Sequence, residues 1–380
     1  MPVARFASWR LRVSRLVCPL VKSFDVIVIG LGGMGSAAAA HLAKRGKRVL
    51  GLDQFTPPHD KGSSHGKNRV IRQAYYEDPS YVPLLLRAYE LWDELGLLTR
   101  TGGLMIGRPE SEVVAGSLRS ARQHNLPHEL LDAAQIRQRF LAFTPSNETV
   151  AVFEANAGFV RPEAAVQAHL DRAARLGATL RFDEKVTDLS GVTVTTTRGK
   201  YEAGKFVITA GPWVTDFVKL PVTVERQVQF WFEPARDLGQ MPIWIWETED
   251  GLHPYGLPAM DGSVKVAMHD HSPRRVCTPD TIDRVVHEEE VEAMRACLRD
   301  RIPALAGRLV DAKTCLYTST ADGHFILDRH PSYDNVLVVS PCSGHGFKFT
   351  PVIGEIVAHL VVDGRTCHSI ELFRLARLKS

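Results

Sequence analysis

The chain has 380 residues, of which 44% are hydrophobic and 23% are charged, and its formal net charge is +3. This length favours about two domains, and the proportions are those of an ordinary globular protein. Five of the basic residues fall in residues 1–24, which contain no acidic residue, so the rest of the chain is close to neutral. A near-neutral body argues against nucleic acid as a partner. Because no apolar run reaches the ~20 residues that span a bilayer, no membrane partner is expected either.

Residues 1–24 precede the first strand expected in the chain. Their arginine-rich, acid-free composition is typical of mitochondrial targeting peptides, but a disordered extension is the preferred interpretation. The six cysteines are scattered without a C-x-x-C pair, which favours a reducing compartment and argues against a metal site. A cytoplasmic location is therefore expected, with the mitochondrion as the alternative.

The strongest single motif lies between residues 24 and 53. An apolar run at 26–29 leads into G-x-G-x-x-G, then an alanine-rich helix is predicted from Ser36 to Arg45, and a second apolar run ends in Asp53. In such a motif the glycines permit a tight turn and close approach to a pyrophosphate, and the acid accepts hydrogen bonds from a ribose. A dinucleotide site is predicted at Gly30, Gly32, Gly33, Gly35 and Asp53. Taken alone, this motif would also allow an NAD-dependent dehydrogenase.

The remaining elements follow in chain order. Helices are predicted over 81–95, around 117–125, from Pro162 to 176, over 281–301 and over 351–360. Short strands are predicted at 179–182, 186–189, 192–197, 206–209 and 336–339. Between 222 and 314, aromatic-rich alternating runs such as 228–232 and 243–246 indicate an antiparallel sheet. A glycine-rich loop at 62–66 suits a phosphate or a planar ring.

Five segments together resemble the monomeric sarcosine oxidase and N-methyl-amino-acid oxidase group of the D-amino-acid-oxidase-like flavoproteins. They read VIVIGLGGMGS, GSSHGKNRVIRQAYYED, TAGPW, KTCLYTSTADGHFILD and SGHGFKF, and they extend from Asp25 to about Leu360. The resemblance implies an α/β protein with a discontinuous Rossmann-like FAD-binding domain, at 25–100, 150–215 and 315–380. A mixed, mostly antiparallel β-sheet domain with helices, at 101–149 and 216–314, would bind the substrate.

The resemblance also implies FAD attached covalently to the thiol of Cys315. Without the resemblance, the default interpretation of Cys315 would be a buried structural cysteine. Further residues that the resemblance or the glycine turns place beside the cofactor are Ser63, His65, Arg69, Val186, Gly211, Gly344, His345, Gly346 and Lys348.

Matching residues of the family hold the substrate or promote its oxidation. Arg72 and Lys348 would bind a carboxylate, which suits a guanidinium fork and an ammonium group, and Tyr317 would add a phenolic donor. Lys265 alternates with apolar residues on a strand, and the family's lysine at this place promotes the reaction with oxygen. His269 and Tyr255 match residues beside the substrate, although each could equally be a hydrogen-bonded core residue. The other histidines, including His253 and His271, are assigned no role.

The predicted reaction is the oxidation of a secondary amino acid, N-methylated or cyclic, to an imine that water hydrolyses. Molecular oxygen is reduced to hydrogen peroxide, and the enzyme is expected to be a monomer. The alternatives are a dehydrogenase with another electron acceptor, a pipecolate or proline oxidase, and a flavin-binding scaffold without activity. The sequence departs from the family's usual pattern at Lys67-Asn68, at Ala321 and over 261–273. These departures leave the identity of the substrate open.

Overall fold

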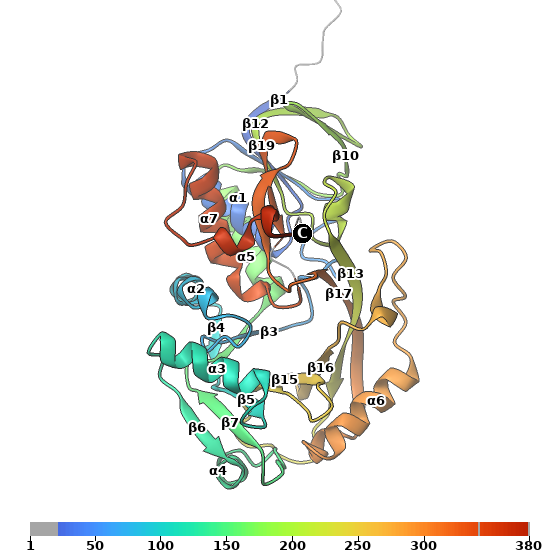
Figure 1. Ribbon diagram of the computed structural model, residues 1–380. Coiled ribbons are helices and arrows are strands. Elements are labelled where there is room, and N and C mark those ends of the chain that lie inside the picture. The colour runs from blue at the N-terminus through green and yellow to red at the C-terminus, as the bar shows by residue number, and fades with distance from the viewer. Residues whose placement is uncertain (1–21, 341–342, 379–380) are drawn as a thin grey trace, which may run out of the picture.

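The computed structural model describes residues 22–340 and 343–378 (Figure 1). Most of the predicted 1–24 extension therefore lies outside the described residues. The first strand, β1 (Lys22–Ile29), begins earlier than predicted, because Lys22, Ser23 and Phe24 already pair with residues 201–203 of strand β12 (Lys200–Ile208). Within the described residues, no helix combines the length and the apolar character that crossing a membrane requires.

The first sheet has a parallel centre, in the order β19-β12-β1-β2-β9, and it lies at the top of Figure 1. Strands β10, β11 and β18 extend it with antiparallel pairs. Central strands such as β2 are buried at every position, as strands covered on both faces must be. The other strands are β2 (Val49–Leu52), β9 (Thr179–Arg181), β10 (Val186–Ser190), β11 (Thr193–Thr196), β18 (Ile326–His330) and β19 (Tyr333–Ser340).

Helices α1 (Gly33–Lys44), α5 (Pro162–Arg175) and α7 (Thr350–Asp363) pack together beside this sheet. The alanines of α1 and Gly354 of α7 allow these two helices to approach each other closely. A Cβ placed on Gly354 would lie only 2.7 Å from the carbonyl carbon of Ala37. This arrangement of a parallel-rich sheet and helices confirms the predicted α/β class with a Rossmann-like part.

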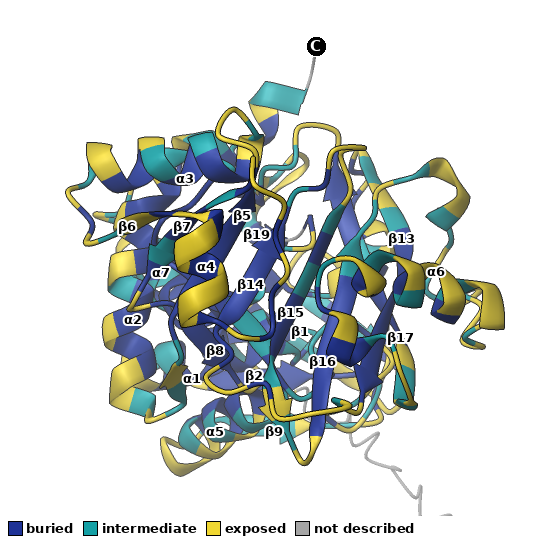
Figure 2. Cartoon of the chain, turned by 90° about the horizontal axis from the view of Figure 1, so that it is seen from below, coloured by how far each residue is buried: buried dark blue, intermediate teal, exposed yellow. Residues whose placement is uncertain are grey.

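The second sheet runs in the order β17-β13-β16-β15-β14-β5-β7-β6, and its strands are mostly dark blue, that is buried, in Figure 2. It is antiparallel as predicted, except that β14 pairs with β5 in parallel. Helices α3 (Glu112–Gln123), α4 (Ala133–Arg139) and α6 (Glu288–Arg299) pack near it. Its strands are β5 (Gly103–Gly107), β6 (Glu129–Asp132), β7 (Val150–Glu154), β13 (Val222–Phe232), β14 (Ile243–Trp246), β15 (His253–Met260), β16 (Ser263–His269) and β17 (Leu309–Thr320).

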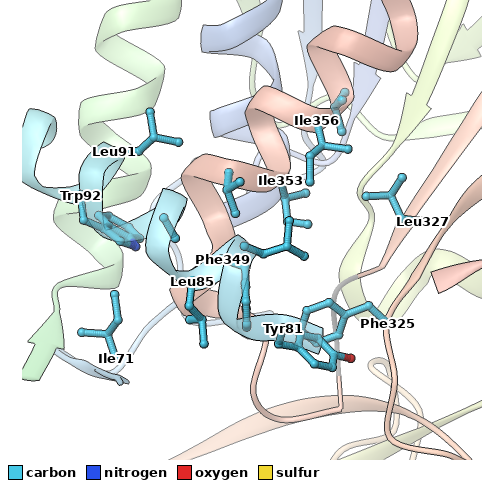
Figure 3. Close-up of a cluster of buried hydrophobic side chains, with 14 of the residues drawn as sticks. Ile71, Tyr81, Leu85, Leu91, Trp92, Phe325, Leu327, Phe349, Ile353 and Ile356 are labelled. Carbon is cyan, nitrogen blue, oxygen red and sulfur yellow. The ribbon is translucent and has the colours of Figure 1, made fainter. Parts of the chain in front are cut away.

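A small antiparallel sheet, β3-β8-β4, and helix α2 (Val82–Leu95) lie between the two large sheets in Figure 1. Figure 3 shows how α2 packs against α7 and the turn before it, with Trp92, Phe349, Tyr81 and Phe325 in one cluster. The indole Nε1 of Trp92 donates a hydrogen bond of 2.7 Å to the carbonyl oxygen of Lys348. The strands are β3 (Arg69–Ile71), β4 (Leu98–Arg100) and β8 (Gly158–Val160), and the 3₁₀ turns are Pro79–Tyr81, Gly211–Asp216, Pro273–Arg275, Pro303–Leu305, Phe347–Phe349, Glu371–Phe373 and Leu375–Leu378.

Three predicted boundaries do not coincide with the ends of one sheet or helix. The helix predicted over 281–301 begins only at Glu288, because His287 and Glu290 form a capping box that starts the helix there. The domain boundary predicted at 150 falls at the first residue of β7, the one at 315 falls within β17, and both strands belong to the second sheet. Cys315 therefore lies in the middle of a strand that pairs with β13 along its length. The division into two domains stays a prediction.

Candidate active site

A long cleft begins where β1 runs into α1 and ends at Cys315 on β17. It encloses about 1280 Å³ of empty space, counting its open mouth. Eleven of the predicted cofactor residues line it: Gly30, Gly32, Gly33, Asp53, Ser63, Arg69, Val186, Gly211, Gly344, Gly346 and Cys315. Tyr317, a predicted substrate residue, lines it as well. The cleft thus joins segments from most of the chain.

The start of α1 forms one end of this cleft. Gly30 has a φ of +90°, which glycine adopts without strain. The first turn of α1 carries no acidic side chain, so its amides favour an anion such as a phosphate. Asp53 is buried, and its Oδ2 accepts a hydrogen bond of 2.6 Å from the backbone N–H of Leu31. The carboxylate therefore holds the glycine turn as well as facing the cleft.

Gly35 does not line the cleft but lets α1 pack against the end of β1. A Cβ on Gly35 would lie 1.8 Å from the carbonyl oxygen of Gly30 and 2.6 Å from the Oγ1 of Thr209. We expect Gly35→Ala to destabilise the protein by about 3 kcal/mol or more, since backbone must move, and to prevent flavin retention. Gly204→Ala is the matched control, because its Cβ would meet nothing closer than 3.7 Å. Thermal unfolding and flavin content measure both effects, and equal behaviour of the two variants would contradict the prediction.

Cys315 is buried and is surrounded by cationic groups. Its Sγ lies 3.7 Å from the Nη2 of Arg69 and 3.8 Å from the carbonyl oxygen of Ser63. Burial alone would raise the pKa of this thiol, but the charges of His65, Arg69 and Lys265 lower the pKa to about 6. The side chain therefore has thiolate character at neutral pH, which is what a reactive cysteine requires.

His65 does not line the cleft but lies behind Cys315, facing a hollow that Lys67, Glu163 and Trp231 also line. It is buried, and neither ring nitrogen has a hydrogen-bond partner within normal distance among the described residues. The loop that carries it is held by Glu163, whose Oε1 accepts from the backbone N–H of Gly66 at 2.6 Å and of Lys67 at 3.1 Å. The proximity of His65 to the thiol therefore depends on this loop.

Lys265 is fully buried in β16, which confirms that it does not face water. Its Nζ donates to the carbonyl oxygens of Gly66 at 2.9 Å and Asn68 at 2.8 Å, and it lies 5.7 Å from the ring centroid of Trp231. Burial, with the charge of Arg69 in the same direction, lowers the pKa of Lys265 well below its usual value. The Nζ of Lys265 is thus held in place by backbone oxygens rather than by a carboxylate.

A second cavity, of about 760 Å³ counting its open mouth, adjoins the first and shares Arg69, Cys315, Tyr317, Gly344 and Phe347 with it. It brings together every predicted substrate residue except Lys265: Arg72, Lys348, Tyr255, His269 and Tyr317. Tyr255 and His269 are only partly buried, because they face this space. His345, which was predicted to lie beside the cofactor, lines the second cavity instead, and so does Lys348.

Arg72 is buried and already has a carboxylate partner. Its Nη2 donates to both oxygens of Glu77 at 2.7 and 2.6 Å, and its Nη1 donates to the carbonyl oxygen of Ala74 at 3.1 Å. The rings of Tyr75 and Tyr76 each lie 4.4 Å from the guanidinium carbon. Although burial opposes ionisation, the charge of Arg72 brings the pKa of Glu77 down to about 2. Glu77 was not predicted, and its proximity to Arg72, five residues away, was the available signal.

Lys348 lies in the turn before α7, with its Nζ donating to the carbonyl oxygen of His345 at 2.6 Å. Burial, reinforced by Arg72, lowers the pKa of Lys348 to about 7. The ring of His345 is fixed on both sides, by the hydroxyl of Tyr75 at 2.5 Å and the carbonyl oxygen of Gly323 at 2.9 Å. Since the carbonyl can only accept, Nε2 carries the proton and Nδ1 accepts from Tyr75.

Tyr255, Tyr317 and His269 form another part of the wall of this cavity. The Nδ1 of His269 lies 3.3 Å from the hydroxyl oxygen of Tyr317. Burial lowers the pKa of His269 to about 3, with His271 and then His345 adding to the effect. A Cβ on Gly344 would lie 2.5 Å from both rings, which explains the glycine at this point of the loop. The imidazole of His269 is therefore neutral near pH 7 and can accept a hydrogen bond from the hydroxyl of Tyr317.

Two histidines that were assigned no role also belong to this region. His253 lines the second cavity, and His271 lies directly behind His269 with their Nε2 atoms 3.0 Å apart. The alternation His269-Asp270-His271 at the end of a strand was the signal for the second one. Away from both cavities, His359, Cys367 and His368 have potential ligand atoms within 4.8 Å of one another, the one such group among residues 22–340 and 343–378.

Comparison with known proteins matches residues 25–360 to a family model described as FAD dependent oxidoreductase. The chain is 51% identical to the monomeric sarcosine oxidase of Streptomyces avermitilis, over 94% of this chain and 98% of that protein. It is 36% identical to the monomeric sarcosine oxidase of Bacillus sp. strain B-0618, over 93% of this chain and 96% of that protein. The chain is also 36% identical to the N-methyl-L-tryptophan oxidase of Salmonella dublin, over 93% of this chain and 99% of that protein.

Solved structures agree with this placement. NikD, described as an unusual amino acid oxidase essential for nikkomycin biosynthesis, superposes with a TM-score of 0.83 at 27% identity, covering 93% of this chain and 97% of that one. The L-proline dehydrogenase of P. horikoshii superposes with a TM-score of 0.84, covering 95% and 99% of the chains. At 22% identity the latter similarity shows the fold alone.

Proposed function

The chain belongs to the FAD-dependent oxidoreductase family, and we propose that it is an oxidase of secondary amino acids. The single observation that carries this proposal is the pair of adjoining cavities. One runs from the glycine turn to Cys315, and the other joins Arg72 and Lys348 to His269 and Tyr317. A cofactor and a small anionic substrate would meet where the two cavities share Tyr317 and Gly344.

The residues of the first cleft fit FAD. The acid-free start of α1 and the glycine turn suit a pyrophosphate, and Asp53 faces the same end of the cleft. At the other end, the thiol of Cys315 with a pKa of about 6 suits a covalent thioether. When bound, FAD supplies the acceptor for two electrons and passes them to oxygen. Lys265 is proposed to lie beside the oxygen, where its protonated form would favour reduction of oxygen.

The second cavity would position the substrate through its charges. Lys348 would bind the carboxylate as a point charge, and the positive field of Arg72 would reinforce it although the guanidinium is paired with Glu77. Tyr255, Tyr317 and His269 would face the amine. The carbon next to nitrogen would then lie toward the cleft that the two cavities share, and the product is an imine, with oxygen reduced to hydrogen peroxide. We further propose that the enzyme acts as a cytoplasmic monomer on an N-methyl amino acid of the sarcosine type.

The experiment is acid precipitation of the purified protein, followed by a peroxide assay. Yellow colour should stay in the pellet of the wild-type protein and move to the supernatant, or be missing, in Cys315→Ala. Cys297→Ala is the matched control, because Cys297 lies on α6 and lines neither cavity. Sarcosine, N-methyltryptophan, pipecolate and proline are then compared as substrates. Colour in the wild-type supernatant would overturn the covalent link, and a yellow protein without peroxide formation would favour a dehydrogenase.

A further inference from the structure

A chain of hydrogen bonds leads from the second cavity to the protein surface. It starts at the Tyr317 hydroxyl, 3.3 Å from the Nδ1 of His269, and continues through the two Nε2 atoms of His269 and His271, 3.0 Å apart. The Nδ1 of His271 lies 2.9 Å from the Oε2 of Glu225. The side chain of His271 is 42% exposed, whereas that of Glu225 is 6% exposed. This series of hydrogen bonds therefore begins in the second cavity, at Tyr317, and reaches solvent at His271.

Strand pairing produces this arrangement. Glu225 on β13 lies directly opposite Tyr317 on β17, and directly opposite residues of an antiparallel pair share a face of the sheet. The same oxygen of Glu225 also accepts from the Oγ of Ser319 at 2.6 Å. The segment after β16 is held by Gln227, whose Nε2 donates to the carbonyl oxygen of Asp270 at 2.5 Å. Both imidazoles are thus fixed by neighbours on β13 and β17.

When both imidazoles are neutral, the donors and acceptors along this series of hydrogen bonds allow one order of protons. A carboxylate can only accept, so the Nδ1 of His271 carries a proton and its Nε2 is free to accept. His269 must then donate from its Nε2, which leaves its Nδ1 as an acceptor toward Tyr317. Glu225 therefore selects, through His271, the form of His269 that presents an unprotonated nitrogen to the cavity.

We propose that Tyr317, His269, His271 and Glu225 form a proton relay that removes the proton from the substrate's ammonium group before oxidation. This inference rests on the proposed function. The N–H bond of the ammonium breaks as the Tyr317 oxygen gains a proton, and the Tyr317 proton moves to the Nδ1 of His269. The Nε2 proton of His269 moves to the Nε2 of His271, where the resulting imidazolium is paired with Glu225. A base in solution finally takes the proton from His271.

The groups around the relay are consistent with this direction. On the cavity side, His269 is faced by His253 on β15, His345 in the turn before α7, and Glu77. On the surface side, His271 is faced by Glu225, and the neighbouring Asp270 is paired with Arg274 and Arg275. Burial makes a lasting charge on His269 unfavourable, so the charge comes to rest on the exposed, carboxylate-paired His271.

The test is anaerobic mixing of the FAD-loaded enzyme with sarcosine, followed by the loss of flavin absorbance at several pH values. In His271→Ala, the rate of reduction should fall about 10- to 100-fold below the pKa of the substrate amine, as expected for loss of a proton-transfer group. The rate should approach the wild-type rate at high pH, where the amine arrives deprotonated. Added imidazole should restore the rate near neutral pH, because it can enter the exposed position of the missing ring.

His287→Ala is the matched control. His287 is 45% exposed and paired with Asp283 at 2.6 Å, like His271 with Glu225, but it lies at the start of α6 and does not line either cavity. Its variant should reduce at the wild-type rate with or without imidazole. A wild-type rate in His271→Ala would overturn the relay. So would a loss of the same size at every pH without imidazole rescue, since that pattern indicates a purely structural role.

A second readout does not depend on turnover. In ¹⁵N NMR spectra of histidine-labelled protein, the relay requires His269 to carry its proton on Nε2, and Glu225→Gln should produce a mixture of the two neutral forms. An Nδ1–H form of His269 in the wild-type protein would overturn the proposal. Failure of the proposed function would look different, because the wild-type flavin would then not be reduced by sarcosine or by any other secondary amino acid.

Discussion

Replacing Arg72 with methionine is expected to lower the free energy of unfolding by about 3–5 kcal/mol, the usual loss when one partner of a buried ion pair is removed. The pair joins the Nη2 of Arg72, whose side chain is 2% exposed, to Glu77, which is 18% exposed. Glu77 would then lose the two hydrogen bonds and the charge of its ion-pair partner. Chemical denaturation measures the loss, and carboxylate binding in the second cavity should weaken in the same variant.

The double variant Arg72→Met with Glu77→Gln should recover much of this loss, since both charges are then absent. Arg100→Met is the control. Arg100 and Asp93 also form an ion pair with two hydrogen bonds, of 2.9 and 2.7 Å, but both side chains are more than 40% exposed. An exposed pair contributes about 1 kcal/mol at most. Equal losses in Arg72→Met and Arg100→Met would contradict the buried-pair argument.

The same pair predicts part of the acid sensitivity of the wild-type protein. The pKa of Glu77 is lowered from 4.5 to about 2 in the folded chain. A carboxylate with a lowered pKa stabilises the fold above its unfolded-state pKa, and this contribution is lost as the pH falls through the folded pKa. The contribution of Glu77 is therefore complete above pH 4.5 and disappears toward pH 2. The double variant should lack this part of the pH dependence.

The second large effect is expected in the pH dependence of carboxylate binding. Burial and Arg72 lower the pKa of Lys348 to about 7 in the free protein, and a bound carboxylate would favour the ammonium form. Below pH 7 the ligand meets a charged Lys348. Above pH 7 the lysine must first take up a proton, so the Kd should rise by close to tenfold per pH unit.

Propionate, which lacks an amine, is a suitable probe because its binding can be followed by the change in flavin absorbance. Lys348→Met should bind it more weakly and remove the dependence between pH 7 and 9. The neighbouring His345 and Glu77 do not titrate in this range, since their pKa values are about 4 and about 2. A Kd that stays constant from pH 6 to 9 in the wild-type protein would contradict the prediction.

The sequence by itself determined the parts of the protein that local chemistry specifies. Glycine spacing, apolar runs and the alanine-rich helix predicted β1, α1 and β2, because each of these elements is encoded within a few neighbouring residues. Aromatic alternation predicted the second sheet for the same reason. The resemblance of five segments predicted the family and supplied the candidate residues, including Cys315, Lys265 and Lys348.

Only the tertiary structure decided how these residues act on one another. In the structure, the guanidinium of Arg72 is paired with Glu77. His65 and Lys265 lie close to Cys315, and His345 lines the second cavity instead of the cofactor cleft. The tertiary structure also joins His271 to Glu225, which are 46 residues apart. These contacts depend on strand register, on burial and on the distances between charges from separate elements. No local pattern of residues encodes the strand register, the burial or those distances.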